Sequence, residues 1–522
     1  MEEKCGNKLS VISIVEIALI IFFAFVMAVS LFGALGEVSV HSTDEACHAI
    51  NAYEMAKSGD YVVWTLKGNV DYYNSKPPLL LWLMTISYKI LGYTPLAMRL
   101  PSAIAGLALF ILGVTYCYKK WGSKEALLFA AFLPACTIMF NFHMFRTGDM
   151  DSLYTLWFAL TMFFMSRAEK KPVSSMILVG VFGGLAFMTK GTHAFFIVAT
   201  CVLFYPFVRK KVNLSYYFLA LASALIVVSP WAIARYLRDG RMLFYALFVG
   251  ETTDKVSNGI ISTEYIRQLF TDSVTVISIA IILVGTVTYL VQIRANNKND
   301  SGIKQENNSI IKAISQTVEN NKEIVLMIIW IGVVVGGYTV SRQTNCWYIF
   351  SAYIPLGMLT SRSVAYLLNK LNNNEKMIPI SEGILMVIAT LCFAIAFNNV
   401  KSYPFGGYDG GSRNRQLINA LQGMKAELPE EEWYGRPMYM EDNLNDYKPQ
   451  NSWELDAVFY AETELDANCI EGGVYEFLQS SDEDALLILN DDLWEEYSGM
   501  LTGYVFLWMD NYYIMNKHRY GE

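Results

Sequence analysis

The sequence has 522 residues, of which 54% are hydrophobic and only 17% charged, and its mean hydropathy is +0.31. This composition excludes an ordinary soluble protein of the same length. From residue 401 onward, 8 Lys and Arg stand against 24 Asp and Glu, a net charge of −16, which leaves +8 for the rest of the chain. An acidic region of this size disfavours nucleic acid and anionic lipid headgroups as partners, because both are negatively charged. We therefore expect a membrane protein that does not bind nucleic acid.

Apolar stretches recur along the first 400 residues, and a helix needs ~20 apolar residues to cross a bilayer. About eleven stretches suit this purpose: 11–35, 100–117, 125–142, 151–167, 173–189, 193–208, 215–234, 272–292, 324–340, 348–366 and 378–398. The first resembles a secretion signal, but it is too long for one and no small-residue cleavage site closes it. We expect it to be an uncleaved anchor. The shorter apolar segment 78–91 contains Lys89 and is expected to lie at the membrane interface.

Basic clusters predict the orientation, because Lys and Arg beside a span resist translocation. They occur at 119–124, 167–171 and 209–211, and in a long polar segment that we expect to be a cytoplasmic loop at 293–323. With the N-terminus inside, all of these clusters lie on the cytoplasmic side. The region that follows the last span then lies outside.

Two domains are expected from this pattern. Residues 1–400 form a polytopic all-α membrane domain with about eleven transmembrane helices. Residues 401–522 form a small, acidic, extracytoplasmic domain. Short apolar stretches such as 485–489 and 503–508 suit strands, so the second domain is expected to be α+β.

Four polar clusters fall on the outer face of this topology, although the topology was drawn from the basic loops alone. They contain Asp44, Glu45 and Lys76 in the first outer loop (36–78), Arg146 and Asp151 before the fourth span, Lys190 in a hairpin, and Arg342 and Tyr348 in a later loop. Each cluster has an ordinary explanation, such as a helix cap, a snorkelling lysine or an interfacial aromatic belt. Together, carboxylates, cations and aromatics on one face indicate an anion-binding catalytic cleft.

The order and spacing of these motifs resemble the GT-C membrane glycosyltransferases, in the branch that contains the protein O-mannosyltransferases and the lipid A aminoarabinose transferases. The motifs that carry the resemblance are Asp44-Glu45, Ser58-Gly59-Asp60, Tyr72 to Leu79 with Lys76-Pro77-Pro78, Trp82, Gly92, Arg99-Leu100-Pro101-Ser102, Asp151, Lys190-Gly191, Pro230-Trp231, Tyr348 and Pro355. They span about residues 10–365, and the Lys-Pro-Pro-Leu loop is the most specific of them. The resemblance implies a membrane domain of the GT-C type.

The resemblance also implies an activity, which is transfer of a sugar from a polyprenyl-phosphate donor to an extracytoplasmic acceptor. The acceptor is a lipid, a cell-envelope glycan or a protein. In a bacterial plasma membrane the donor lipid is expected to be undecaprenyl phosphate.

Roles for the candidate residues follow from this chemistry. The acceptor hydroxyl needs a carboxylate base, for which we expect Asp44, with Glu45 beside it and Asp151 orienting the acceptor or Asp44. The leaving phosphate needs cations. The residues expected to bind the phosphate are Lys76, Arg342, Tyr348, Arg146 and Lys190. A direct displacement inverts the anomeric centre.

The sequence departs from the family at two positions. Ser75 stands where the aminoarabinose branch has an acidic metal ligand, so dependence on a divalent metal ion is left open. Cys47 stands where that branch has an Arg, so a phosphate contact from this position is missing. A polytopic lipid or solute transporter is the alternative function, because charged clusters between spans also mark substrate pathways. The sequence shows no internal repeat of the kind that transporters often carry.

Overall fold

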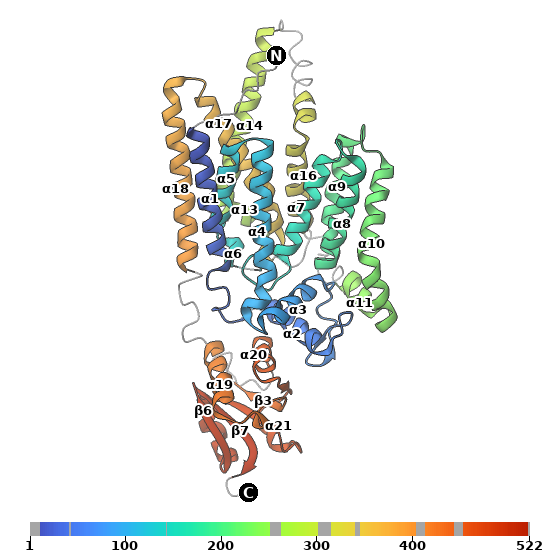
Figure 1. Ribbon diagram of the computed structural model, residues 1–522, viewed down its shortest axis with the longest axis vertical. Helices are drawn as coiled ribbons and strands as arrows, with labels where there is room; N and C mark the ends of the chain where they lie inside the picture. The colour runs from blue at the N-terminus through green and yellow to red at the C-terminus, as the bar shows by residue number, and fades with distance from the viewer. Residues whose placement is uncertain are drawn as a thin grey trace, which may run out of the picture. The chain divides into compact units, whose positions relative to one another are not determined.

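The computed structural model describes residues 11–519, except 41–42, 142, 251–262, 301–314, 340–344, 403–412 and 443–452. Helices make up most of these residues (Figure 1). The chain divides into two compact units. Unit 1 comprises Met1–Gly33, Ser75–Leu79 and Ser102–Phe405, and unit 2 comprises Ala34–Asn74, Leu80–Pro101 and Gly406–Glu522.

Unit 1 is a bundle of helices that run side by side (Figure 1). Its helices are α1 (Val11–Phe32), α4 (Pro95–Lys120), α5 (Ser123–Ala135), α6 (Ile138–Asn141), α7 (Asp151–Arg167), α8 (Pro172–Lys190), α9 (Phe195–Val208), α10 (Leu214–Asp239), α11 (Met242–Tyr245), α13 (Glu264–Thr271), α14 (Ser273–Asp300), α16 (Lys322–Tyr338), α17 (Tyr353–Leu371) and α18 (Ile378–Ser402). The first part of α4, as far as Pro101, belongs to unit 2. Short 3₁₀ turns, η1 (Gly191–Ala194) and η3 (Cys346–Ala352), precede α9 and α17. Helix α8 packs between α7 and α10, and α5 contacts α1, α17 and α18.

Each of the eleven expected spans overlaps one of these helices, although 125–142 covers both α5 and α6, and 348–366 begins within η3. Six stretches of the described residues are helical, long and apolar enough to cross a bilayer: Ile14–Phe32, Pro95–Lys120, Pro172–Val208, Leu214–Asp239, Ser273–Ala295 and Glu375–Lys401. One of them, Pro172–Val208, contains both α8 and α9. A membrane-spanning helical protein is therefore confirmed, whereas the number of eleven crossings stays a prediction.

Small residues explain the close packing of α8 on α10. A Cβ atom added to Gly180 would lie 2.0 Å from the carbonyl oxygen of Ala220, and one added to Gly184 would lie 3.0 Å from that of Ala224. Within a membrane, helices gain stability from such close approach of their backbones. Gly183 differs, because a Cβ atom there would meet nothing within 4 Å.

Unit 2 combines the segment after α1 with the C-terminal part of the chain. Its first part contains α2 (Thr43–Ser58), the two-stranded β1 (Thr65–Leu66) and β2 (Asn69–Val70), and α3 (Leu79–Leu91). Helix α3 corresponds to the expected interfacial segment 78–91. It has 13 residues, and its position at a membrane surface stays a prediction.

A five-stranded mixed sheet forms the C-terminal part of unit 2, with the strand order β4-β3-β5-β7-β6. The elements are α19 (Arg413–Glu427), β3 (Pro437–Glu441), α20 (Leu455–Leu465), β4 (Asn468–Cys469), α21 (Val474–Gln479), β5 (Leu486–Asn490), α22 (Trp494–Leu501), β6 (Tyr504–Met509) and β7 (Tyr512–Arg519). Strand β3 is parallel to β4 and β5, whereas β7 is antiparallel to β5 and β6. The expected strands at 485–489 and 503–508 thus correspond to β5 and β6.

Contacts within unit 2 join α2 to α20. The Tyr53 hydroxyl donates to Asp466, and Lys57 Nζ lies 3.0 Å from the same carboxylate. The Tyr460 hydroxyl accepts a hydrogen bond of 2.7 Å from the Val40 amide. Part of the segment that we expect to be the first outer loop therefore packs on the C-terminal part of unit 2.

Candidate active site

A buried ion pair joins the start of α7 to the end of α8. Lys190 Nζ contacts Asp151 Oδ1, and the two residues are only 5% and 6% exposed. Two aromatic rings accompany the ammonium group, with centroids 5.3 Å away for Tyr348 and 5.9 Å away for Tyr154. Burying a charge is costly unless it is paired, so Asp151 and Lys190 hold each other in this position. Lys190, one of the residues expected to bind the donor's phosphate, is thus in contact with both the predicted Asp151 and the ring of Tyr348, another of them.

Gly191 allows the chain to turn directly after Lys190. Its φ is +55°, which favours glycine, and a Cβ atom here would lie 2.5 Å from Leu247 Cδ1. The same Cβ atom would lie 3.4 Å from Cδ of Pro77. The Lys-Gly hairpin therefore lies against the Lys-Pro-Pro segment, and Lys76 precedes the contacting proline.

Further polar aromatics extend this cluster. The Tyr338 hydroxyl and His193 Nδ1 are hydrogen-bonded, and the Tyr338 ring stacks on Tyr348 with centroids 5.0 Å apart. The Tyr154 hydroxyl donates to the His193 carbonyl at 2.8 Å. Neither His193 nor Tyr338 was a candidate from the sequence, and the two residues lie 145 positions apart.

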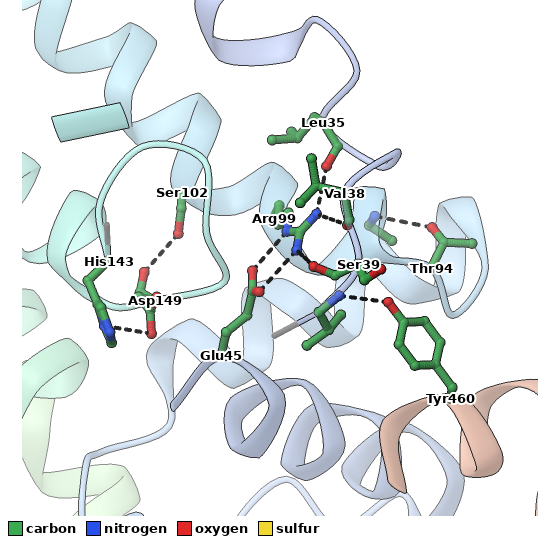
Figure 2. A network of polar contacts seen from close by, with 12 residues as sticks. Leu35, Val38, Ser39, Glu45, Thr94, Arg99, Ser102, His143, Asp149 and Tyr460 are labelled. Carbon is green, nitrogen blue, oxygen red and sulfur yellow. Dashed lines mark hydrogen bonds and ion pairs between the residues drawn. The ribbon is translucent and has the colours of Figure 1, made fainter. Parts of the chain in front are cut away.

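A second carboxylate lies two residues before Asp151. Asp149 is 1% exposed, and its Oδ1 lies 3.2 Å from His143 Nδ1 (Figure 2). The His143 ring stacks on Trp347, with centroids 3.7 Å apart and planes 11° from parallel. The Asp149 backbone is held as well, because its carbonyl accepts a hydrogen bond of 2.8 Å from Ser102 Oγ on α4. His143 was not among the residues that the sequence indicated.

Arg146 lies on the same loop but binds the end of another helix. Its Nη1 donates to the Ser30 carbonyl at 2.8 Å and to the Leu31 carbonyl at 3.1 Å. These carbonyls belong to the last turn of α1, where backbone acceptors lack partners within the helix. These contacts favour a structural role for Arg146 over the phosphate-binding role expected from the sequence.

In unit 2, Arg99 forms hydrogen bonds to the segment between α1 and α2 (Figure 2). Its guanidinium donates to both Glu45 oxygens, at 2.8 and 3.0 Å. It also donates to three carbonyls, of Leu35 at 3.0 Å, Val38 at 2.6 Å and Ser39 at 3.0 Å. All five donors of an arginine are used in this way.

This pairing separates the two acids of the Asp-Glu motif. The Glu45 carboxylate is fully buried and engaged by Arg99. Asp44, in the first turn of α2, is exposed. Glu45 therefore holds the segment before α2 in place through Arg99. Of the two acids of the motif, Asp44 is the one that is exposed to solvent.

The remaining candidates are Arg342, Ser75 and the metal. Arg342 lies outside the described residues. Ser75 is buried. Within the part of the chain that the structure describes, no group of three or more His, Cys, Asp or Glu side chains is arranged to hold a metal ion. Metal dependence thus stays a question for a chelator experiment.

Comparison with known proteins gives a family match for the part of the chain that carries these motifs. Residues 75–233 match the family described as dolichyl-phosphate-mannose-protein mannosyltransferase. An undecaprenyl phosphate-alpha-4-amino-4-deoxy-L-arabinose arabinosyl transferase of Aeromonas salmonicida is 29% identical over 215 residues, which are 40% of this chain and 39% of that protein. An enzyme of the same name from Sodalis glossinidius is 30% identical over 227 residues, 41% of this chain and 39% of the relative. The matched region thus spans about two fifths of these relatives.

A solved structure extends the similarity to the whole chain. The crystal structure of ArnT from Cupriavidus metallidurans bound to undecaprenyl phosphate superposes with a TM-score of 0.64, covering 98% of this chain and 99% of ArnT. The identity of 14% means that this likeness shows the fold alone. The shared fold and the apolar helices make the chain an integral membrane protein. With the family match, they confirm the resemblance seen in the sequence: the chain is related to the GT-C membrane glycosyltransferases, in the branch of the protein O-mannosyltransferases and aminoarabinose transferases.

Proposed function

We propose that this protein transfers a sugar from a polyprenyl-phosphate donor to an acceptor hydroxyl, and that the Asp151–Lys190 cluster binds the donor's phosphate. The observation that carries the proposal is the buried Lys190, held by Asp151 beside Tyr348 and next to the Lys-Pro-Pro segment. The relatives named as undecaprenyl phosphate-dependent transferases support the same donor class. No finding supports the transporter alternative.

The leaving group explains why the site needs cations. When the bond between the anomeric carbon and the phosphate oxygen breaks, negative charge grows on the phosphate. Lys190 stabilises this charge. Lys76 and Arg342 are further cations, and the Tyr348 hydroxyl donates a hydrogen bond to the phosphate. The ammonium group of Lys190 is already fixed before the donor arrives, because Asp151 and two aromatic rings surround it. A preorganised cation stabilises the transition state without a further cost of reorganisation.

Asp44 is the proposed general base. The acceptor oxygen bonds to the anomeric carbon as its proton passes to the Asp44 carboxylate, and the sugar leaves the phosphate from the opposite side, which inverts the anomeric centre. Asp44 is exposed at the start of α2, and the neighbouring Glu45 is anchored by Arg99. We propose Glu45 as the residue that positions Asp44, and Asp151 as the residue that orients Lys190.

A cavity next to the Lys190 hairpin suits the lipid chain of such a donor. It has a volume of about 320 Å³ and lies among α8, α9 and α10. Phe187, Ala194 and Phe195, which flank the hairpin, line it. Its other lining side chains are almost all apolar, and several of them, such as Val198 and Leu221, are exposed on the surface of the bundle. A fixed cation next to an apolar cavity matches a lipid phosphate, in which a charged group joins a hydrocarbon chain. We assign the cavity to the prenyl chain.

The remaining parts of the proposal follow the expected topology. The site and the C-terminal region face the extracytoplasmic side of a bacterial plasma membrane. The acceptor is a lipid, a cell-envelope glycan or a protein. Dependence of the activity on a divalent metal ion is tested by adding the ion and by removing it with a chelator.

The test uses purified full-length protein in lipid nanodiscs and a panel of radiolabelled donors. We expect transfer, or slow hydrolysis, from a polyprenyl-phosphate sugar and none from a nucleotide sugar. Asp44→Asn should lose at least about 100-fold in rate, which is the usual contribution of a general base. Asp484→Asn is the matched control, because Asp484 is an exposed acid of the C-terminal region. Use of nucleotide sugars in place of lipid donors, or full activity of Asp44→Asn, would overturn the corresponding part of the proposal.

A further inference from the structure

The C-terminal sheet of unit 2 has two edges of different character (Figure 1). Strand β4 forms one edge and has only two residues, so it offers little backbone for pairing. Strand β6 forms the other edge with six residues, Tyr-Val-Phe-Leu-Trp-Met, none of which is charged or a proline. Proteins usually protect a sheet edge from other chains by short length, charge, proline or a bulge. Of these, β6 has only a bulge, between Tyr504 and Phe506, so the part nearest the turn to β7 is unprotected.

The backbone of β6 is suited to pairing on its outer side. A two-residue turn, Asp510–Asn511, joins β6 to β7, and the two residues have φ values of +42° and +71°. In such a hairpin the residues next to the turn are hydrogen-bonded to each other, and bonded and non-bonded pairs then alternate. Met509 and Leu507 therefore bond to β7, whereas Trp508 and Phe506 direct their N–H and C=O groups to the outer edge. Among the described strands, none lies along that edge.

Trp508 adds an aromatic side chain to this edge. It lies opposite Tyr513 of β7, and the Tyr513 ring stacks on Trp494 of α22 with centroids 4.4 Å apart. Residues opposite each other in a strand pair share a face, so Trp508 lies on the face that α22 covers. Its side chain is nevertheless 52% exposed. Tryptophan side chains are typical anchors of protein interfaces.

The surface around Trp508 is acidic. Residues 481–512, which include β5, α22 and β6, contain eight Asp and Glu and no Lys, Arg or His. Asp491 is close enough to interact with the Trp508 side chain, and Glu495 and Glu496 are exposed in the first turn of α22. Such a surface attracts a cationic partner and repels an acidic one.

The basic residues of this part of the chain lie elsewhere. Those of β7, at 517–519, are at the end of the ribbon that is farthest from the turn. Helix α19 also carries basic residues, but it packs on the opposite face of the sheet, where Gly423 lies against Met509. Successive residues of a strand point to opposite faces, so Met509 and Trp508 are on different sides. The face with the exposed indole is therefore the acidic one.

We propose that the outer edge of β6 binds a basic, extended segment of another protein, which adds a strand to the sheet. Trp508 and Phe506 supply the backbone groups, and every second side chain of the segment lies on the acidic face, where Lys or Arg meets the indole and the carboxylates. A second copy of this chain is disfavoured as the occupant, because it would place the same acids side by side. Since the C-terminal region is proposed to face outward, the partner is an extracytoplasmic protein. The inference does not depend on sugar transfer.

Binding of defined peptides to the full-length protein, in nanodiscs of neutral lipid, tests this proposal. The probe is a fluorescent peptide of alternating Lys and Val, and its control has Glu in place of Lys. We expect the Lys peptide to bind with an affinity that falls as salt is added, and the Glu peptide not to bind. Equal binding of the two peptides would overturn the choice of a basic partner.

Substitutions test whether the peptide binds at β6. Trp508→Lys should weaken binding at least about tenfold, as loss of a tryptophan anchor typically does. Glu495→Gln combined with Glu496→Gln should weaken it about threefold or more, since each exposed charge contributes modestly. The matched control is Glu430→Gln combined with Glu431→Gln, which removes two exposed acids before β3 and should leave the affinity unchanged. Equal losses in the two double variants would mean general attraction to the acidic region and would refute the site.

A methylated peptide tests the pairing of strands. The Lys peptide with a methyl group on every backbone nitrogen keeps its charges but cannot donate backbone hydrogen bonds, so it should bind at least about tenfold more weakly. Undiminished binding would refute strand addition, and this comparison uses wild type, so it decides even if Trp508→Lys does not fold. Dimers of the full-length protein that Trp508→Lys abolishes, together with no binding of the Lys peptide, would make a second copy the occupant and overturn the proposal.

Discussion

Replacement of Arg99 should destabilise unit 2 more than any surface substitution. Arg99→Met removes the guanidinium that donates to both oxygens of Glu45, whose carboxylate is fully buried. Removing one partner of a buried ion pair costs about 3–5 kcal/mol, since the other charge stays buried. The hydrogen bonds to the carbonyls at 35, 38 and 39 are lost as well. We therefore expect a free energy of unfolding at least about 3 kcal/mol lower than that of wild type.

The assay is thermal unfolding of the purified protein, combined with limited proteolysis between α1 and α2. Arg99→Lys should retain only part of the stability, because an ammonium has three donors where the guanidinium has five. Arg99→Met combined with Glu45→Gln should cost less than the sum of the single changes, because the pair acts as a unit. Additive effects, or an Arg99→Lys protein as stable as wild type, would refute the reasoning.

Three further predictions concern other sites. Gly183→Leu should fill the cavity among α8, α9 and α10 without disturbing helix packing, and it should raise KM about tenfold for a long-chain donor but not for a short-chain one. The control is Gly332→Leu, because a side chain added at Gly332 also meets open space. Equal effects of Gly183→Leu on both donors would contradict the assignment of the cavity to the prenyl chain. Burial, and then the charges of Glu54 and Asp466, raise the pKa of the Glu462 carboxyl well above its usual range. The folded state thus binds this proton more tightly, so stability should fall as the pH rises from about 4.3, the usual pKa of Glu, towards the raised pKa. In Glu462→Gln, the free energy of unfolding should no longer fall with rising pH over this range. A fall that persists in this variant would contradict the prediction. Gly191→Ala should cost about 1–3 kcal/mol through its positive φ and the contact with Leu247, and should lower transfer as well; a variant with wild-type stability and rate would contradict this.

The helices were predictable because each depends on a continuous apolar stretch. Their ends were less so. The expected span 125–142 is interrupted, because α5 ends at Ala135, next to a proline, and the short α6 follows. The expected span 348–366 begins at Tyr353, since residues 346–352 form a 3₁₀ turn. Composition places apolar segments, whereas the hydrogen-bonded turns at their ends depend on contacts with other helices.

The ion pair of the site was predictable, because its two oppositely charged residues fall on the same expected face of the membrane domain. Asp151 and Lys190 were both placed there, and they are in contact. The direction of a side chain is not visible in the sequence. Arg146 therefore looked like a phosphate ligand, although its guanidinium holds the end of α1. His143 lies near Asp149 in sequence, but its other partner, Trp347, is about 200 residues away, and only the folded chain brings them together.

The central claim is that Lys190 binds the phosphate of a polyprenyl-phosphate sugar during transfer. The most direct measurement is formation of free undecaprenyl phosphate from undecaprenyl-phosphate sugar in a single turnover, followed by mass spectrometry for wild type and Lys190→Met at equal amounts of folded protein. We predict release by wild type and a rate lower by at least about 100-fold in Lys190→Met, as is typical when a preorganised donor to the developing charge is removed. Release at the wild-type rate from Lys190→Met would contradict the account of the site, and no release from folded wild-type protein with any sugar would contradict the proposed activity.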